Sequence, residues 1–65
     1  MPDLHPTLTA KVEDAKRLTM SAGSLLQNGV TCADDLYLVE DDLERALKIV
    51  RDALNTQVEF EEEQA

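Results

Sequence analysis

The stretch QNGVTCAD at positions 27–34 ends one helix and begins the next. Asn28 and Gly29 tolerate the left-handed backbone conformation that closes a helix. Thr31 offers a hydroxyl to cap the following helix, and Asp34, three residues later, completes a signal similar to a capping box. On each side of this stretch, apolar residues recur at helical spacing. Because the connection is short, we expect an all-α fold in which two helices form an antiparallel hairpin.

Prolines and charges set the expected boundaries of the hairpin. Pro2 and Pro6 disfavour helix in the residues that precede them, which favours an extended arm at the N-terminus. The carboxylates that crowd the C-terminus oppose the helix dipole, so we expect the second helix to fray there. The expected segments are the extended arm (1–6), the helical hairpin (7–58) with a helix at about 7–28, a turn at 29–31 and a helix at about 32–57, and an acidic C-terminal tail (59–65).

Each predicted helix carries an apolar stripe whose members alternate spacings of three and four residues. The middle of the first stripe is small, since it contains Ala15, Thr19 and Ala22, and small side chains let another helix approach closely. The second stripe is wider than one antiparallel partner can cover. The residues that we expect in the core or in a dimer interface are Leu8, Val12, Ala15, Leu18, Thr19, Ala22, Leu25, Leu26, Leu36, Val39, Leu43, Ala46, Leu47, Val50 and Leu54.

A chain of 65 residues has little core of its own. Domains near this length bury only about 60% of their unfolded surface. Cys32 is the only cysteine and His5 the only histidine, so neither an internal disulfide nor a four-ligand zinc site can support the fold. We therefore expect a homodimer in which two hairpins form a four-helix bundle. The alternative is a hairpin that completes its core against a different protein. The homodimeric layout resembles small helical-hairpin dimers of the Rop type.

The net charge of −8 is unevenly distributed. Residues 1–31 carry three acids and three bases, whereas residues 32–65 carry eleven acids and three bases. This balance disfavours nucleic acids and anionic membranes and favours protein partners with a basic or apolar surface. Tyr37 and Phe60 are the only aromatic residues, so no platform exists for stacked bases. With no apolar run of membrane-spanning length and no signal-peptide pattern, we expect a cytoplasmic protein.

The carboxylates of residues 34–44 lack the pattern of a catalytic or metal site. A calcium loop needs oxygen ligands at alternating positions and a glycine, but this segment has no glycine and residues 36–39 interrupt it. General acid–base chemistry needs buried carboxylates in a pocket, for which a small hairpin has little room. Cys32 would gain reactivity at a helix N-terminus, but Asp34 and Asp35 oppose that effect. We expect no enzyme activity, no metal and no cofactor.

Several residues outside the main stripes are candidates for binding a partner, although they could equally cover the edge of the bundle. These residues are Tyr37, Leu38, Asp41, Glu44 and Ile49. The favoured hypothesis is a homodimeric hairpin that regulates or inhibits another protein, as an anti-activator or adaptor of a phage or bacterium does. The alternative is an acidic nucleic-acid mimic that occupies the basic groove of a DNA-binding protein. Arg45, Lys48 and Arg51 interrupt the carboxylate array that a mimic requires.

Overall fold

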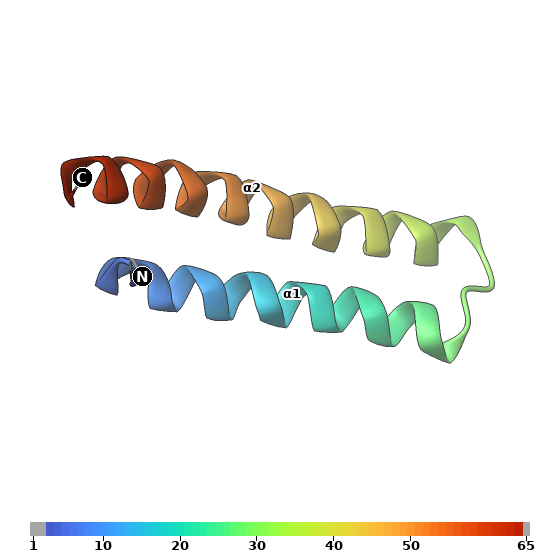
Figure 1. Cartoon of the computed structure of the whole chain (residues 1–65). Coiled ribbons are helices and arrows are strands. Elements are labelled where there is room, and N and C mark those ends of the chain that lie inside the picture. Colours follow the sequence, from blue (N-terminus) through green and yellow to red (C-terminus); the bar gives the residue numbers. More distant parts are fainter. Residues whose placement is uncertain (1–2, 65) are drawn as a thin grey trace.

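The computed structural model describes residues 3–64 as two antiparallel helices joined by a short turn (Figure 1). A 3-10 turn, η1 (Pro6–Leu8), leads directly into α1 (Thr9–Asn28), and α2 (Ala33–Gln64) returns alongside it. Both described chain ends lie at the end of the hairpin opposite the turn (Figure 1). The predicted all-α hairpin is confirmed.

The N-terminal segment is more ordered than an extended arm. Pro6 opens η1, where its fixed φ suits a helix and its missing N–H costs nothing. His5 caps this turn, because its Nδ1 accepts a hydrogen bond from the Thr7 amide at 3.2 Å. The Thr7 Oγ1 lies 2.7 Å from the same ring nitrogen. Only Asp3 to His5 therefore precede the first helical turn, and residues 1 and 2 of the expected arm lie outside the described residues.

The second helix is longer than the sequence pattern predicts. It continues to Gln64 instead of ending near residue 57, so the expected acidic tail is helical up to that residue. Glutamate is a good helix former, and its propensity outweighs the unfavourable dipole interaction of exposed carboxylates. Phe60 adds a tertiary contact, since it is half-buried against the ring of His5. Residue 65 lies outside the described residues.

The turn uses the residues that mark it in the sequence. Gly29 closes α1 with φ of 101°, a conformation that side-chain-bearing residues rarely adopt. The cap of α2 differs from the expected one, because Asp35 rather than Asp34 binds Thr31. The Oδ2 of Asp35 accepts hydrogen bonds from the Thr31 amide and from the Thr31 hydroxyl, each at 3.1 Å. Asp35 is the third residue of a helix that begins at Ala33, the position from which an acidic side chain reaches back.

Substitution of Asp35 should remove a pH-dependent part of the stability. The Thr31 amide and then its hydroxyl stabilise the carboxylate, so the pKa of Asp35 lies below its ordinary value of 3.8. Because the folded pKa is lowered, this contribution is present above the unfolded value and is lost as pH falls through the folded value. Urea unfolding between about pH 5 and pH 2 should therefore show a smaller acid-induced loss in Asp35→Asn than in the wild type. Asp34→Asn, in the same helical turn, should retain the wild-type slope; equal slopes for all three proteins would contradict the cap.

The core between the helices is narrow and made mainly of small side chains. The buried residues are Leu8 of η1, Ala15 and Ala22 of α1, and Val39 and Ala46 of α2. Leu18, Leu25 and Ile49 are half-buried beside them. Small residues at heptad spacing allow two helices to approach closely, but they remove little apolar surface from water. The hairpin thus buries one edge of each apolar stripe and leaves the other edge open.

The hairpin exposes more surface than a globular protein of its mass. Its accessible surface is 5186 Å², whereas a compact monomer of 7.2 kDa exposes roughly 4,100 Å². The radius of gyration is 15.0 Å, compared with roughly 11 Å for a compact domain of 65 residues. The molecule measures 49 × 16 × 14 Å, so it is a rod two helices wide.

Candidate interaction surfaces

The structure divides the predicted interface residues into a core group and an exposed group. The five buried core residues belong to the predicted set, as do the half-buried Leu18 and Leu25. The remaining members are exposed along the two helices: Val12, Thr19, Leu26, Leu36, Leu43, Leu47, Val50 and Leu54. About half of the residues in each predicted stripe therefore pack between the helices, and the other half are exposed.

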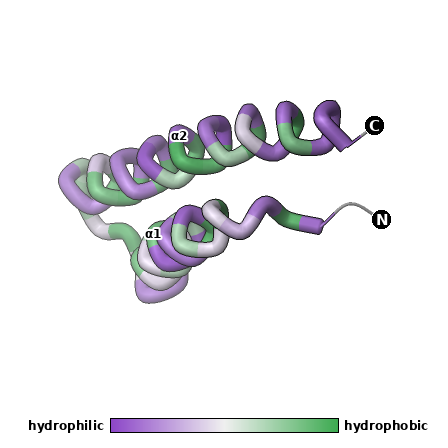
Figure 2. Tube along the Cα trace, turned by 90° about the vertical axis from the view of Figure 1, so that its left-hand side faces the viewer, coloured by the Kyte–Doolittle hydropathy of each residue, from purple (hydrophilic) through white to green (hydrophobic). Residues whose placement is uncertain are grey.

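The exposed group forms one surface, which we term the apolar face. On α2, Leu36, Leu43 and Val50 follow one another at intervals of seven residues and so share a stripe. Leu47 and Leu54 lie within the same stripe at helical spacing. Hydrophobic segments recur along α2 from the turn towards its C-terminal end (Figure 2). The large aliphatic side chains of this stripe are 44–58% exposed.

Two shallow grooves show that both helices contribute to the apolar face. One, of about 240 Å³, brings Leu4, Leu8 and Val12 together with Val50 and Leu54 of α2. The other, of about 450 Å³, follows α2 alone and its lining includes Leu36, Leu43 and Leu47. Since these residues share one stripe of α2, the grooves lie on the same side of the hairpin. Apolar side chains therefore border this side from the turn to the N-terminal segment.

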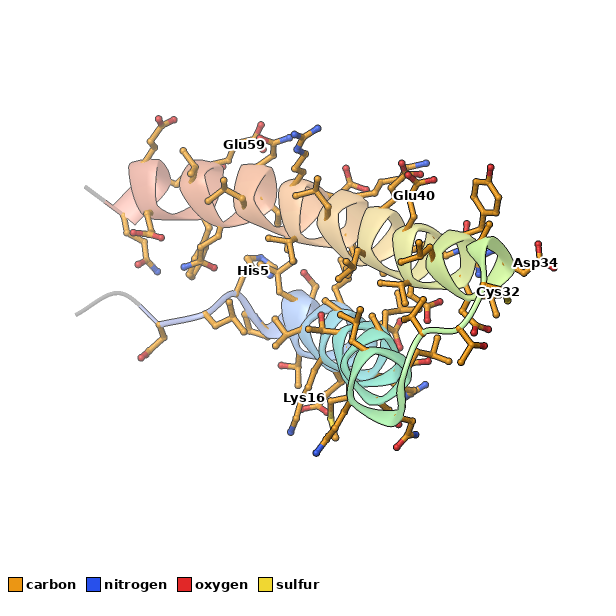
Figure 3. The ribbon with its side chains drawn as sticks, turned by 90° about the vertical axis from the view of Figure 1, so that its right-hand side faces the viewer. His5, Lys16, Cys32, Asp34, Glu40 and Glu59 are labelled. Carbon is orange, nitrogen blue, oxygen red and sulfur yellow. The ribbon has the colours of Figure 1, made fainter. Side chains whose placement is uncertain are left out.

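The N-terminal segment is fastened to α2 by one glutamine side chain. Gln57 donates from Nε2 to the Asp3 carbonyl at 2.8 Å and accepts from the His5 amide at Oε1, also at 2.8 Å. The His5 ring, which points from this segment towards α2 (Figure 3), meets Phe60 edge-on with ring centroids 4.8 Å apart. This contact holds Leu4 beside Leu54 on the apolar face. Sequence reasoning missed the role of Gln57, but Phe60 continues the heptad series of Val39, Ala46 and Ala53 and could have been assigned to the contact.

Removal of the Gln57 amide should release the N-terminal segment without unfolding the hairpin. Gln57→Ala loses two hydrogen bonds, each worth about 1 kcal/mol. The free energy needed to open the N-terminal segment falls accordingly, so amide exchange at His5 and Leu8 should become at least about tenfold faster. The His5 ring protons, displaced in the NMR spectrum by the neighbouring Phe60 ring, should move to random-coil values. Gln64→Ala, at an exposed position of the same helix, should leave both readouts unchanged. His5 ring resonances at their wild-type positions in Gln57→Ala would show that Gln57 does not hold the N-terminal segment against α2.

A groove of different chemistry lies between the helices on the opposite side, and we term it the charged groove. It encloses about 390 Å³ and is lined by Asp14, Arg17, Leu18, Arg45, Lys48 and Ile49. Arg17 Nη1 lies 3.8 Å from Asp14 Oδ1, and Arg45 Nε lies 3.1 Å from Asp41 Oδ2. Both pairs are well exposed, so each contributes little to stability.

The candidate partner-binding residues do not gather on one surface. Glu44 lines the groove beside Leu43 and Leu47 on the apolar face. Ile49 is half-buried between the helices, where it lines both the charged groove and the 240 Å³ groove of the apolar face. Asp41 is paired with Arg45 on the rim of the charged groove. Leu38 precedes Arg45 by seven residues and so shares its stripe, on the side of the charged groove. Tyr37, at 66% exposed, precedes Glu44 by the same interval and so lies in the stripe of Glu44, at the outer edge of the apolar face.

The abundant carboxylates do not converge on a ligand. Within residues 3–64, no group of three or more His, Cys, Asp or Glu side chains is arranged to hold a metal ion. Glu40 and Glu59 project from α2 away from α1 (Figure 3), and the Cys32 thiol is exposed at the turn. The same residues contain no helix that is both long and apolar enough to cross a membrane.

No protein-family model, curated protein or solved structure matches this chain.

Proposed function

We propose that this protein is a non-enzymatic interaction module of the cytoplasm, a homodimer of helical hairpins that regulates or inhibits another protein. The observation that carries the proposal is the apolar face. Most of its large aliphatic side chains come from one stripe of α2 and are about half exposed. Contiguous exposed apolar surface of this extent is typical of sites that bind another protein.

The excess surface of the hairpin matches the amount that a dimer removes. It exceeds the surface expected for a compact protein of its mass by roughly 1,000 Å². A protein–protein interface of standard size buries about 800 Å² on each partner. A second copy supplies an apolar face of the same length, and a twofold axis places identical stripes against each other. Two paired hairpins form a four-helix bundle, in which each helix buries a stripe against two neighbours.

The sequence of α1 favours close approach of the second copy. Thr19 lies between the small residues Ala15 and Ala22, and its hydroxyl is satisfied by the Ala15 carbonyl at 2.8 Å. It therefore presents its methyl group at little polar cost. With Val12 and Leu26 at either end, the exposed part of α1 is a shallow apolar strip that the leucines of α2 from a second molecule can cover.

Molecular mass in solution tests the dimer. Sedimentation equilibrium over a wide range of micromolar concentrations should give twice the chain mass of 7.2 kDa. Helical content, measured in parallel by circular dichroism, should fall as the dimer dissociates, since isolated hairpins of this size lack core. A well-folded monomer throughout the concentration range would overturn the proposal.

The nucleic-acid mimic remains the alternative function. Lys48, together with Arg45 in its pair with Asp41, places bases among the carboxylates of α2, whereas mimicry needs uninterrupted negative charge. Binding to a DNA-binding protein that falls steeply with salt would favour the mimic, and salt-insensitive binding to a partner would favour apolar recognition.

A further inference from the structure

We propose that the charged groove binds an acidic, apolar segment of the regulated protein. This inference rests on the proposed function as an interaction module and concerns the side of the hairpin that pairing through the apolar face leaves free. Leu18 and Ile49 form the floor of this groove between the helices, and Arg17, Arg45 and Lys48 border it. The partner supplies aliphatic side chains for the floor and carboxylates for the borders.

Basic residues are more frequent around this groove than in the chain as a whole. The whole protein has six Lys and Arg residues against fourteen acids. Three of those bases line the charged groove, against Asp14 among its lining residues and Asp41 beside Arg45 on its rim, so bases outnumber acids here although the whole chain is strongly acidic. At physiological salt the screening length is about 8 Å, so an approaching segment responds mainly to these nearby charges rather than to the acidic end of α2.

The bordering side chains keep donors available for a carboxylate. Arg45 uses Nε in its contact with Asp41, which leaves the two terminal nitrogens of its guanidinium for a second acceptor. The contact of Arg17 with Asp14 is long, at 3.8 Å, and both side chains are more than half exposed. Lys48 makes no ion pair with any residue of the described range 3–64. A partner carboxylate can therefore form charge-assisted hydrogen bonds here without first breaking a buried pair.

The floor of the groove accounts for the apolar part of the partner. Leu18 and Ile49 are only half-buried by the hairpin, and they lie side by side where α1 and α2 meet. A groove between two helices takes aliphatic side chains spaced along one face of a short helix. Carboxylates that flank those side chains would reach the bases on the two walls.

Selection from a random library tests the chemistry of the groove. Displayed peptides of about 12 residues, roughly three helical turns, would be selected on the intact protein at about 0.15 M salt. Selected peptides should be rich in Asp and Glu beside Leu, Ile or Phe. Synthetic copies should bind at least about tenfold more weakly when their acids are replaced by Lys. An absence of binders, or binders without an acidic bias, overturns the inference.

Two charge-matched double variants locate the binding site. Arg17→Glu/Lys48→Glu reverses the charge of two basic residues that line the groove. Lys16→Glu/Arg51→Glu makes the same change of charge at two nearby basic residues that do not line it. Lys16 projects from α1 away from α2 (Figure 3). Affinity for the selected peptides should fall at least about tenfold in the first variant only. Equal affinity in both variants would place the site elsewhere and overturn the inference.

Further measurements on these variants separate the possible outcomes. Sedimentation and circular dichroism should show the same dimer and helical content for wild type and both variants. A dimer that binds no acidic peptide would contradict the groove alone, whereas a monomer would contradict the proposed dimer. A short DNA or RNA oligonucleotide that binds the wild type and is lost only in Arg17→Glu/Lys48→Glu would reassign the groove to nucleic acid.

Discussion

Replacement of Leu47 by glutamate should dissociate the dimer or raise its dissociation constant by two or more orders of magnitude. Leu47 lies near the middle of the apolar stripe of α2 and is 49% exposed in the hairpin. Burial of a whole leucine contributes about 1.5–3 kcal/mol, so burial of the exposed half contributes about half of that, and a twofold interface contains the residue twice. Each glutamate also places an unpaired carboxylate in the interface, whose desolvation costs on the order of 1 kcal/mol or more. The loss of about 3–6 kcal/mol corresponds to a change of roughly 10²–10⁴ in the dissociation constant. Sedimentation equilibrium of wild type and variant at matched concentrations measures it.

Two leucines near the turn provide a matched control. Leu36 and Leu38 are each 55% exposed and are two positions apart on α2. Leu36 belongs to the apolar face, whereas Leu38 lies on the side of the charged groove. Leu36→Glu should therefore weaken the dimer, and Leu38→Glu should leave its mass unchanged. Equal behaviour of these two variants would show that general hydrophobicity, and not the apolar face, causes association.

Substitution of Leu8 by alanine should unfold much of the protein. Leu8 is 1% exposed and is the only large side chain that is fully buried within the described residues. Truncation of a buried leucine to alanine typically costs about 2–5 kcal/mol. A core of this size rarely supplies more than about 3–5 kcal/mol of net stability. The remaining stability of Leu8→Ala should be close to zero near room temperature, as measured by urea unfolding.

Leu4 is the control for this experiment, since it is aliphatic, precedes Leu8 by four residues and is 48% exposed. Leu4→Ala should lower the unfolding midpoint only slightly. Each protein should be measured at several concentrations, because dimerisation adds stability that depends on concentration. A Leu8→Ala protein that unfolds at the wild-type midpoint would show that the contact between η1 and α2 contributes little.

The hairpin and its turn could be predicted because their signals are local. Gly29 has the positive φ that its position after Asn28 indicates, and the two stripes show helical periodicity on either side. The cap residue was wrong by one position, because the exact start of α2 decides whether Asp34 or Asp35 reaches back to Thr31. A helix start is set by hydrogen bonds that several neighbouring residues can make almost equally well.

The rotation of each helix could not be predicted from the width of the stripes. Leu18 and Leu25 were placed beside the main stripe of α1, yet they face α2, while Val12 and Leu26 are exposed. A rotation of α1 that turns Leu18 and Leu25 towards α2 and one that turns Val12 and Leu26 towards it both bury apolar side chains. The two rotations differ by less than the angle between consecutive residues of a helix. The choice depends on contacts between the helices, where Ala15 and Ala22 allow an approach that leucines would prevent.

The attachment of the N-terminal segment was invisible in the sequence for a different reason. It depends on a glutamine that binds two backbone groups more than fifty positions away, and such polar contacts leave no periodic pattern. The charged groove was likewise missed, since its bases come from both helices and only the antiparallel pairing brings Arg17 near Arg45 and Lys48.

The position of the chain ends has a consequence for linking two copies in one polypeptide. Asp3 and Gln64 lie at the same end of a hairpin 49 Å long (Figure 1). If the two turns of the dimer lie at the same end, a linker of a few residues joins one copy to the next. If they lie at opposite ends, the linker must span the length of the rod, which takes about 15 extended residues. The shortest linker that yields a compact, unimolecular four-helix bundle therefore reports the orientation of the two hairpins.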